Sequence, residues 1–99
     1  MKINMTRTEN TLVVALEGRL DTITAPELEQ GLRDSLTKDV TELIFDFEAL
    51  DYISSAGLRT MMLAYKEMRD RGTMRIVHVN EIVGEVFEVT GFSKIMNIQ

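Results

Sequence analysis

The residues whose types and spacing could carry chemistry gather in the stretch Asp51–Arg59, which reads DYISSAGLR. Two adjacent hydroxyl residues, Ser54 and Ser55, stand between an apolar run and a helical pattern. One hydroxyl can cap the helix by accepting a hydrogen bond from a free backbone amide. A cap needs only one of them, and the small residues Ala56 and Gly57 clear the surroundings of bulk. The stretch therefore predicts either a simple helix cap or a cap beside a serine presented for modification.

Phosphorylation is the modification that suits such a serine. A phosphate at the start of a helix would face the positive end of the helix dipole. It would add a charge of about −1.5 to −2 without unfolding the domain. The consequence would be a changed docking surface on an unchanged fold.

Three aspartates and one histidine are the remaining candidates. Asp21, Asp46 and Asp51 could form an acidic rim near Ser55, or they could be solvated turn residues bonded to their own backbone. His78 is the only histidine and the chain has no cysteine, so we expect no metal site and a packed, hydrogen-bonded strand histidine. An enzyme using Asp46, Ser55 and His78 would need these groups within hydrogen-bonding reach, and no G-x-S-x-G turn is present. We expect neither catalysis nor a cofactor, since no phosphate-cradling glycine motif occurs.

Length and charge limit the classes of protein that this sequence can be. The 99 residues, 44% of them hydrophobic, predict one domain over residues 1–99 with one modest core. The net charge of −5, without a basic cluster, argues against direct nucleic-acid binding. No signal-peptide core or bilayer-spanning run is present, so we expect a cytoplasmic protein without a membrane segment. Either a monomer or a weak dimer fits the sequence.

Apolar patterns predict four strands that would position these residues. Residues 2–6 and 11–17 alternate in polarity and predict two strands joined by a short hairpin. We expect Gly18 to end the second strand. Residues 43–47 and 74–79 are mostly apolar and predict strands covered on both faces.

The first helix has a clear predicted start. Thr24 and Glu27 fit a capping box, in which each side chain bonds the other's backbone amide. Ile23 and Leu28 occupy the positions of a hydrophobic staple. We expect this helix to end near Lys38.

Two further helices follow the serine stretch and the last predicted strand. The second carries an apolar stripe and should end at Gly72; the stripe is Leu58, Met61, Met62, Tyr65 and Met68. The third should be capped by Asn80 and end at Gly91. The tail, residues 93–98, predicts a short helix, a last strand, or both.

The element order β-β-α-β-α-β-α predicts an α/β fold. Right-handed crossovers should make a mixed, mostly parallel sheet of four to five strands with three to five helices, after an N-terminal hairpin. Functional groups gather at the carboxyl ends of parallel strands. The loop after Phe47, which includes the serines, and the tip at Asn80 should therefore lie at one edge.

Four segments in this order resemble the STAS domain family, and within it the free-standing bacterial anti-sigma factor antagonists. They are Gly18–Asp21 with Thr24–Leu28, the strand Leu43–Phe47, the segment Tyr52–Leu58 and the closing turn Val89–Phe92. The resemblance covers nearly the whole chain and implies a STAS fold over residues 1–99.

The resemblance implies a phosphoprotein that regulates transcription by partner switching. In these antagonists a serine kinase that is also the anti-sigma factor phosphorylates a serine of the segment Tyr52–Leu58. Alignment on Gly57 and Leu58 makes that serine Ser55, with Ser54 as the alternative, because many antagonists have aspartate at the latter position. The unphosphorylated form binds the anti-sigma factor and frees the sigma factor, phosphorylation breaks the complex, and a PP2C-type phosphatase restores it.

The implied partner-binding surface combines the acidic positions with the start of the second helix. Its expected residues are Asp21, Asp46, Ser54, Ser55, Ala56, Gly57, Leu58 and Arg59. An alternative remains open, because STAS domains also serve as constitutive subunits of transporters or stress-sensing assemblies. Such a subunit would use the same face without phosphorylation.

Overall fold

Five strands form one sheet in the order β1-β2-β3-β4-β5 in a computed structural model that describes all residues 1–99. β1 pairs with β2 in an antiparallel hairpin, and all the later neighbours are parallel. The strands are β1 Lys2–Thr8, β2 Thr11–Leu20, β3 Glu42–Ile53, β4 Thr73–Val77 and β5 Asn97–Ile98. The predicted mixed, mostly parallel sheet is confirmed.

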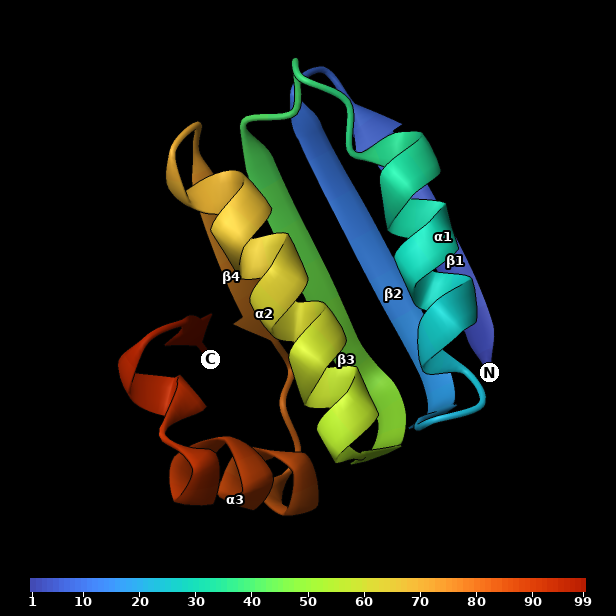
Figure 1. Cartoon of the computed structure of the whole chain (residues 1–99), viewed down its shortest axis with the longest axis vertical. Coiled ribbons are helices and arrows are strands. Elements are labelled where there is room, and N and C mark those ends of the chain that lie inside the picture. Colours follow the sequence, from blue (N-terminus) through green and yellow to red (C-terminus); the bar gives the residue numbers. More distant parts are fainter.

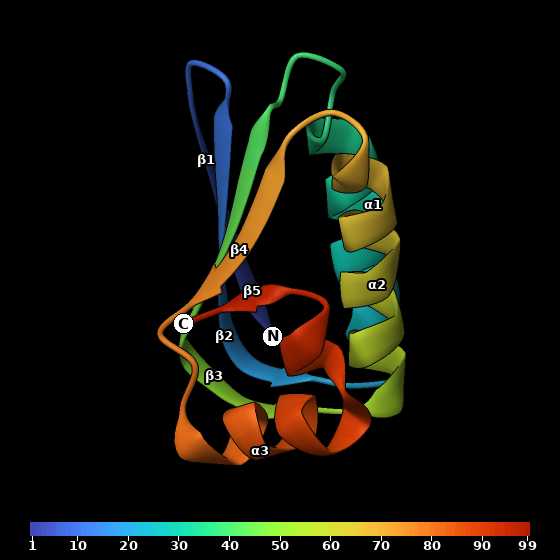
Figure 2. The same cartoon turned by 90° about the vertical axis from the view of Figure 1, so that its left-hand side faces the viewer.

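Three α-helices and one 3₁₀ helix complete the chain. They are α1 Ala25–Ser35, α2 Ser55–Arg69, α3 Glu81–Thr90 and η1 Phe92–Lys94. α1 and α2 lie side by side on one face of the sheet, and α3 lies across its lower end (Figure 1). The edge-on view shows no helix on the other face, which we call the open face (Figure 2). The tail contains both alternatives, since η1 is followed by the short strand β5.

The core lies between the sheet and the α1–α2 layer. Alternate residues over most of β2 and β3 point toward the helices and are almost fully buried, as in a sheet covered on one face. The predicted cover on both faces of β3 and β4 is therefore wrong, because all the helices that pack on a face of the sheet lie on the same side. The largest fully buried strand residues include Leu12, Leu16, Leu43, Phe45 and Phe47, and the helices add Leu28, Met61 and Met68. Of the predicted apolar stripe of α2, Leu58, Met61 and Met68 are buried, and Met62 and Tyr65 are half-buried. No helix combines the length and the apolar character needed to cross a bilayer.

Two strands run further than their sequence pattern indicates. β2 continues through Gly18 to Leu20, and β3 continues past Phe47 to Ile53. The predicted strand end at Gly18 is wrong, because this glycine lies inside the strand with φ of +104°, next to a register shift. The register between β2 and β3 shifts at two points, and at each of them β3 has one residue more than β2. Beyond Phe47 the buried residues of β3 therefore recur at every third position and not at every second. The polar-looking end of β3 is therefore still strand, and the predicted loop after Phe47 is not formed.

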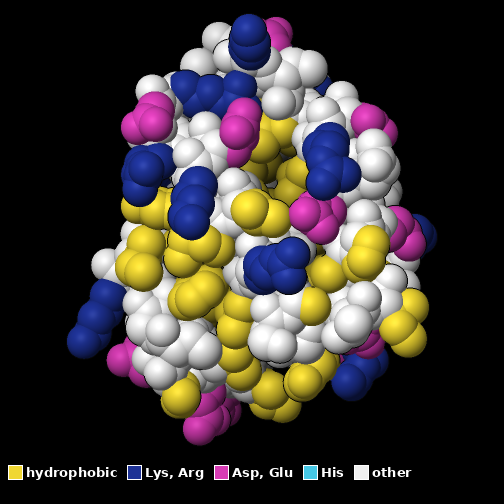
Figure 3. Space-filling view, in the orientation of Figure 1, with side chains coloured by type: hydrophobic (Ala, Val, Ile, Leu, Met, Phe, Trp, Pro, Cys, Tyr) yellow, Lys and Arg dark blue, Asp and Glu magenta, His cyan; other side chains and the backbone are white.

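The helix-covered face is hollowed between α1 and α2 (Figure 3). The hollow has a volume of about 450 Å³. Leu32, Leu36 and Ala64 are among its apolar lining residues, and Glu29 and Arg33 are among its charged ones. Its α2 residues begin at Thr60, so the hollow lies further along this helix than the two serines.

Candidate functional site

The two serines at the start of α2 have different roles. Ser54 is the N-cap: its Oγ accepts a hydrogen bond from the Gly57 amide at 3.4 Å. Its own amide donates to the carbonyl oxygen of Leu20 at 2.9 Å. Ser55 is the first residue of the helix, its side chain is exposed, and its hydroxyl forms no hydrogen bond within the chain. One hydroxyl is used for capping, and the other is presented to solvent.

The small residues after the serines serve packing more than access. A Cβ on Gly57 would lie 2.8 Å from side-chain atoms of both Ile53 and Leu20, and 3.0 Å from the Leu20 carbonyl oxygen. The first turn of α2 therefore sits directly against the ends of β2 and β3, and only glycine fits there. Gly57 is buried, so it clears space for the core and not for a partner.

The remaining residues predicted at this helix start divide by exposure. Leu58 is buried beneath the turn, with 8% of its surface exposed, so it supports the surface from below. Ala56 is half-buried, and Arg59 is exposed one helical turn after Ser55. The accessible part of the predicted surface on α2 is therefore Ser55 with Arg59, and Ala56 lies between them.

Asp21 shapes the turn between β2 and α1. Its Oδ1 accepts hydrogen bonds from the amides of Ile23 at 3.0 Å and Thr24 at 3.1 Å. The Thr24 amide bond is the strongest influence on this carboxyl, and together with the Ile23 bond it holds the Asp21 pKa below its ordinary value. The charged carboxylate therefore organises the loop as an Asx turn.

The predicted capping box at α1 is wrong. The Thr24 hydroxyl makes no cap to the helix, because it accepts from the Asp21 amide at 2.9 Å and donates to the Arg19 carbonyl at 2.8 Å. Since this hydroxyl is held by the preceding turn, it is not available to the amide of Glu27. The staple is wrong as well: Leu28 is fully buried, but Ile23 is 86% exposed and points into solvent.

The sequence analysis did not predict that Arg19, Ile23 and Tyr52 are exposed in and beside this turn. Arg19 and Tyr52 are paired across β2 and β3, and the guanidinium lies 4.3 Å from the centre of the tyrosine ring. Their pairing depends on the register shift after Gly18, which no local pattern reveals. The usable signal was Ile23, a large apolar residue in an otherwise polar turn.

Strand pairing brings the β2–α1 turn and the serines to one edge of the sheet. Leu20 and Ile53 are register partners, and each is the last residue of its strand. Asp21 and Ser54 directly follow these partners, so the β2–α1 turn and the first turn of α2 lie at the same end of the sheet, where Asp21 is bonded to its own turn. Asp51 is exposed in β3 and forms no ion pair or side-chain hydrogen bond.

Asp46 does not join that edge. It lies on the open face, seven residues before the end of β3, which corresponds to roughly 20 Å along an extended strand. Its neighbours Phe45 and Phe47 point into the core, so alternation turns Asp46 away from α2. The acidic rim near Ser55 therefore lacks this carboxylate.

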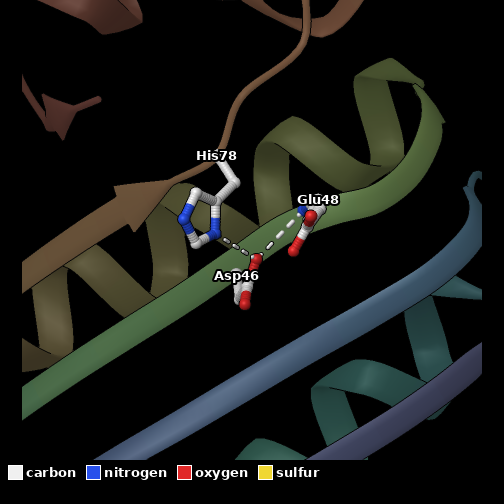
Figure 4. Close-up of side chains that lie close together, drawn as sticks. All are labelled: Asp46, Glu48 and His78. Atoms are coloured by element: carbon white, nitrogen blue, oxygen red, sulfur yellow. Dashed lines mark hydrogen bonds and ion pairs between the residues drawn. The ribbon is translucent and has the colours of Figure 1, made fainter.

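A second polar cluster forms around Asp46 on the open face (Figure 4). His78 Nδ1 lies 2.9 Å from Asp46 Oδ1, and the same oxygen accepts from the Glu48 amide at 3.0 Å. β4 ends at Val77, and His78 is 59% exposed with φ of +59°. The predicted packed strand histidine is therefore wrong, although the predicted hydrogen bonding is present.

Asp46 and His78 favour each other's charged forms. The hydrogen bond to Asp46 is the main reason that the pKa of His78 lies above its ordinary value. Desolvation raises the Asp46 pKa, but the hydrogen bonds from His78 and Glu48 outweigh it and lower the pKa overall. Ligand atoms of Asp46, Glu48 and His78 lie within 4.8 Å of one another, so these are the residues that could approach a metal ion together. Ser55 is not part of this cluster, and no serine-histidine-aspartate arrangement is formed.

A sequence model of the STAS domain family matches residues 2–99. BtrV of Bordetella bronchiseptica, designated as a candidate anti-sigma factor antagonist, is 34% identical over 99 residues. The match covers 99% of this chain and 85% of BtrV.

Solved structures with this fold include one protein in two chemical states. The anti-sigma factor antagonist SpoIIAA in its unphosphorylated form superposes with a TM-score of 0.85 at 22% identity, over 99% of this chain and 88% of that one. The phosphorylated form of the Bacillus cell fate determinant SpoIIAA gives a TM-score of 0.78 at 21% identity, over 99% of this chain and 91% of the other.

Proposed function

Because this chain belongs to the STAS domain family, we propose that it is an anti-sigma factor antagonist switched by phosphorylation of Ser55. In its unphosphorylated state it binds an anti-sigma factor that is also a serine kinase, and so releases the sigma factor. Phosphate on Ser55 ends that binding, and a PP2C-type phosphatase restores it. The chain acts in the cytoplasm, where sigma factors engage RNA polymerase.

Relatives support the general function. BtrV, which is 34% identical to this chain, is itself designated as a candidate antagonist. SpoIIAA, which shares the fold, is known with and without a phosphate. Both observations favour a regulatory binding protein over an enzyme.

The division of roles between Ser54 and Ser55 is the observation that carries the proposal. A kinase must bring the γ-phosphate of ATP in line with an accessible hydroxyl. The Ser54 side chain is held by the Gly57 amide, whereas the Ser55 side chain is exposed and has no partner within the chain. Ser55 is therefore the better acceptor, and Ser54 takes the structural role of the cap.

The geometry also explains how a phosphate could act as a switch without unfolding the domain. At the first position of α2 the phosphate would lie near free backbone amides, which stabilise negative charge. Gly57 and Leu58 keep the turn anchored against the strands beneath it. The added charge would therefore change the docking surface only, by repelling or displacing the partner. ATP, Mg²⁺ and the catalytic base come from the kinase.

The test is partner capture followed by reconstitution. Wild type, Ser55→Ala, Ser55→Asp and Ser54→Ala would be used as baits, and the retained kinase would be purified and mixed with each variant and ATP. We expect Ser55→Asp to bind the kinase more weakly by roughly tenfold or more. We expect Ser55→Ala to bind without accepting phosphate, and Ser54→Ala, the matched control, to be phosphorylated still.

Three results would overturn the proposal. The first is equal affinity of wild type and Ser55→Asp for the kinase, and the second is phosphate mapped to Ser54. The third is retention of the same transporter or scaffold subunit by wild type and Ser55→Asp, which would make the serines a helix cap on a constitutive interface.

A further inference from the structure

α3 has an apolar face that the core does not use. Val83 and Phe87 are fully buried and attach the helix to the domain. Ile82, Val86 and Val89, which we call the α3 strip, follow the i, i+4, i+7 spacing and share a different face. The helix therefore presents one apolar face to the core and a second to solvent.

The α3 strip is open to solvent along its length. Ile82 is 64% exposed, Val89 is 80% exposed, and Val86 is half-buried between them. The three residues line a shallow hollow of about 340 Å³ together with Glu85 and Thr90. Hydrophobic side chains gather along the lower edge of the molecule, over α3 (Figure 3). β-Branched residues are mediocre helix formers, so at exposed helical positions they bring no local advantage.

Negative charge runs beside the strip. Glu81, Glu85 and Glu88 repeat the same spacing one position earlier and are all exposed. None of them forms an ion pair, although Glu88 accepts a hydrogen bond from the Ser93 hydroxyl at 2.9 Å. α3 itself contains no lysine or arginine. An approaching surface would therefore meet apolar side chains bordered by uncompensated carboxylates.

This charge distribution decides between two possible occupants. A second copy of the chain would bring its own three glutamates to the same strip, and the like charges would repel. A partner whose apolar residues are flanked by Lys or Arg would bury the strip and neutralise the border. We propose that the α3 strip docks an amphipathic helix of a partner protein that has basic residues beside its apolar stripe.

The position of α3 connects this strip with the serine switch. Asn80 caps α3 through the Val83 amide at 2.8 Å, and its side-chain amide donates to the Leu50 carbonyl of β3 at 2.8 Å. α3 is thereby fixed at the end of the sheet where α2 begins (Figures 1 and 2). One partner can cover Ser55 and the strip together, and this identification of the partner with the anti-sigma factor rests on the proposed function.

The first experiment tests the chemistry of the strip with defined probes. A labelled helical peptide with a leucine stripe flanked by lysines would be titrated with the full chain, beside a matched peptide with glutamates in place of the lysines. We expect the lysine peptide to bind tighter by roughly tenfold and to weaken as salt is added. Ile82→Ala combined with Val89→Ala should weaken its binding by about tenfold. Leu63→Ala, at an exposed apolar residue of α2, is the matched control and should leave binding unchanged.

Three results would overturn the proposal. The first is equal affinity of the lysine and glutamate peptides for the chain. The second is a loss of affinity in the Leu63→Ala control as large as that in the double alanine variant. The third is self-association of the wild-type chain that the double alanine variant abolishes. Sedimentation of wild type and variant reports the last of these, and circular dichroism confirms that both are folded.

The second experiment uses the anti-sigma factor kinase, to separate this inference from the proposed function. If the double alanine variant binds the kinase like wild type while Ser55→Asp does not, the strip is not part of that interface and the switch stands. If the double variant loses affinity while Ser55→Asp binds normally, the strip stands and the switch fails. We expect both variants to lose affinity.

Discussion

The start of α2 and the open face of the sheet each gather polar side chains, and they use them differently. On the open face, Asp46 is bonded to the His78 ring and to the Glu48 backbone amide, and Asp46 and His78 carry opposite charges when His78 is protonated. At the start of α2, Ser54 is committed to the backbone while Ser55 is left without an internal partner. The Asp46–His78 pair is therefore satisfied within the chain, whereas the Ser55 hydroxyl is available to another molecule.

The difference lies in what holds each backbone in place. In the open-face cluster, Asp46 and Glu48 belong to β3, whose backbone is paired with β2 and β4, and His78 follows β4 in a left-handed backbone conformation. The serine turn is held by apolar packing, since Gly57 lies against Leu20 and Ile53 beneath it. This apolar support fixes the first turn of α2 while leaving the Ser55 side chain exposed and without an internal partner.

The largest effect on stability is expected from Gly57→Ala, which disturbs the apolar packing beneath the first turn of α2. The new methyl would lie 2.8 Å from Leu20 and Ile53 side-chain atoms and 3.0 Å from a backbone oxygen that cannot move freely. We expect the free energy of unfolding to fall by about 1–3 kcal/mol, as in other overpacked sites. Urea unfolding followed by circular dichroism measures it.

Gly84→Ala is the matched control for that substitution. Gly84 is also helical, but the nearest atom to its new Cβ is a Val79 methyl at an ordinary 3.5 Å. We expect no loss and a gain of up to about 1 kcal/mol from helix propensity. Equal loss in both variants would mean that the α2 start is not specially packed.

A smaller effect should separate the two serines. Ser54→Ala removes the cap of α2 and should lower the free energy of unfolding by about 1 kcal/mol. Ser55→Ala removes a hydroxyl without a partner and should change it by less than about 0.5 kcal/mol. Thermal unfolding of the two variants beside wild type gives the comparison, and the reverse order would exchange their assigned roles.

The smallest effect should come from His78→Asn, and it should depend on pH. Asparagine tolerates the left-handed backbone of this position but cannot titrate. Because folding raises the His78 pKa, its stabilising contribution is complete below the ordinary histidine value and is lost as pH rises through the raised one. The variant should therefore be less stable than wild type at mildly acidic pH and equal to it at alkaline pH.

Asp46→Asn is the partner test for the open-face cluster. The Asp46 pKa is lowered by folding, so its contribution is present above the ordinary aspartate value and is lost as pH falls through the lowered one. Between mildly acidic and alkaline pH, the loss in free energy of unfolding should change in the same way for His78→Asn and Asp46→Asn. The double variant should lose little more than either single variant. A stability difference that does not change with pH would show that the pair contributes no charge interaction. Both side chains are partly exposed, and solvent screening keeps these effects small.

Local signals were reliable where neighbouring residues decide the structure. Asn80 caps α3 and Gly91 ends it with φ of +81°, as predicted from residue type alone. The capping box at Thr24 failed because its hydroxyl has a better partner in the preceding turn, where Asp21 organises the backbone. The residue types are compatible with a Thr24 cap on α1 and with a Thr24 bond to the preceding turn, and the path of the chain before α1 determines which one forms.

The sequence by itself determined the order of strands and helices, the mixed and mostly parallel sheet, and the placement of two serines at a helix start. These features depend on apolar periodicity and on residues close together in the chain. Tertiary structure alone decided that β3 extends to Ile53, that Asp46 pairs with His78, and that Gly57 fits against two strand ends. Each of those outcomes joins residues from different elements through register shifts and packing, and such distances are set only when the whole core is assembled.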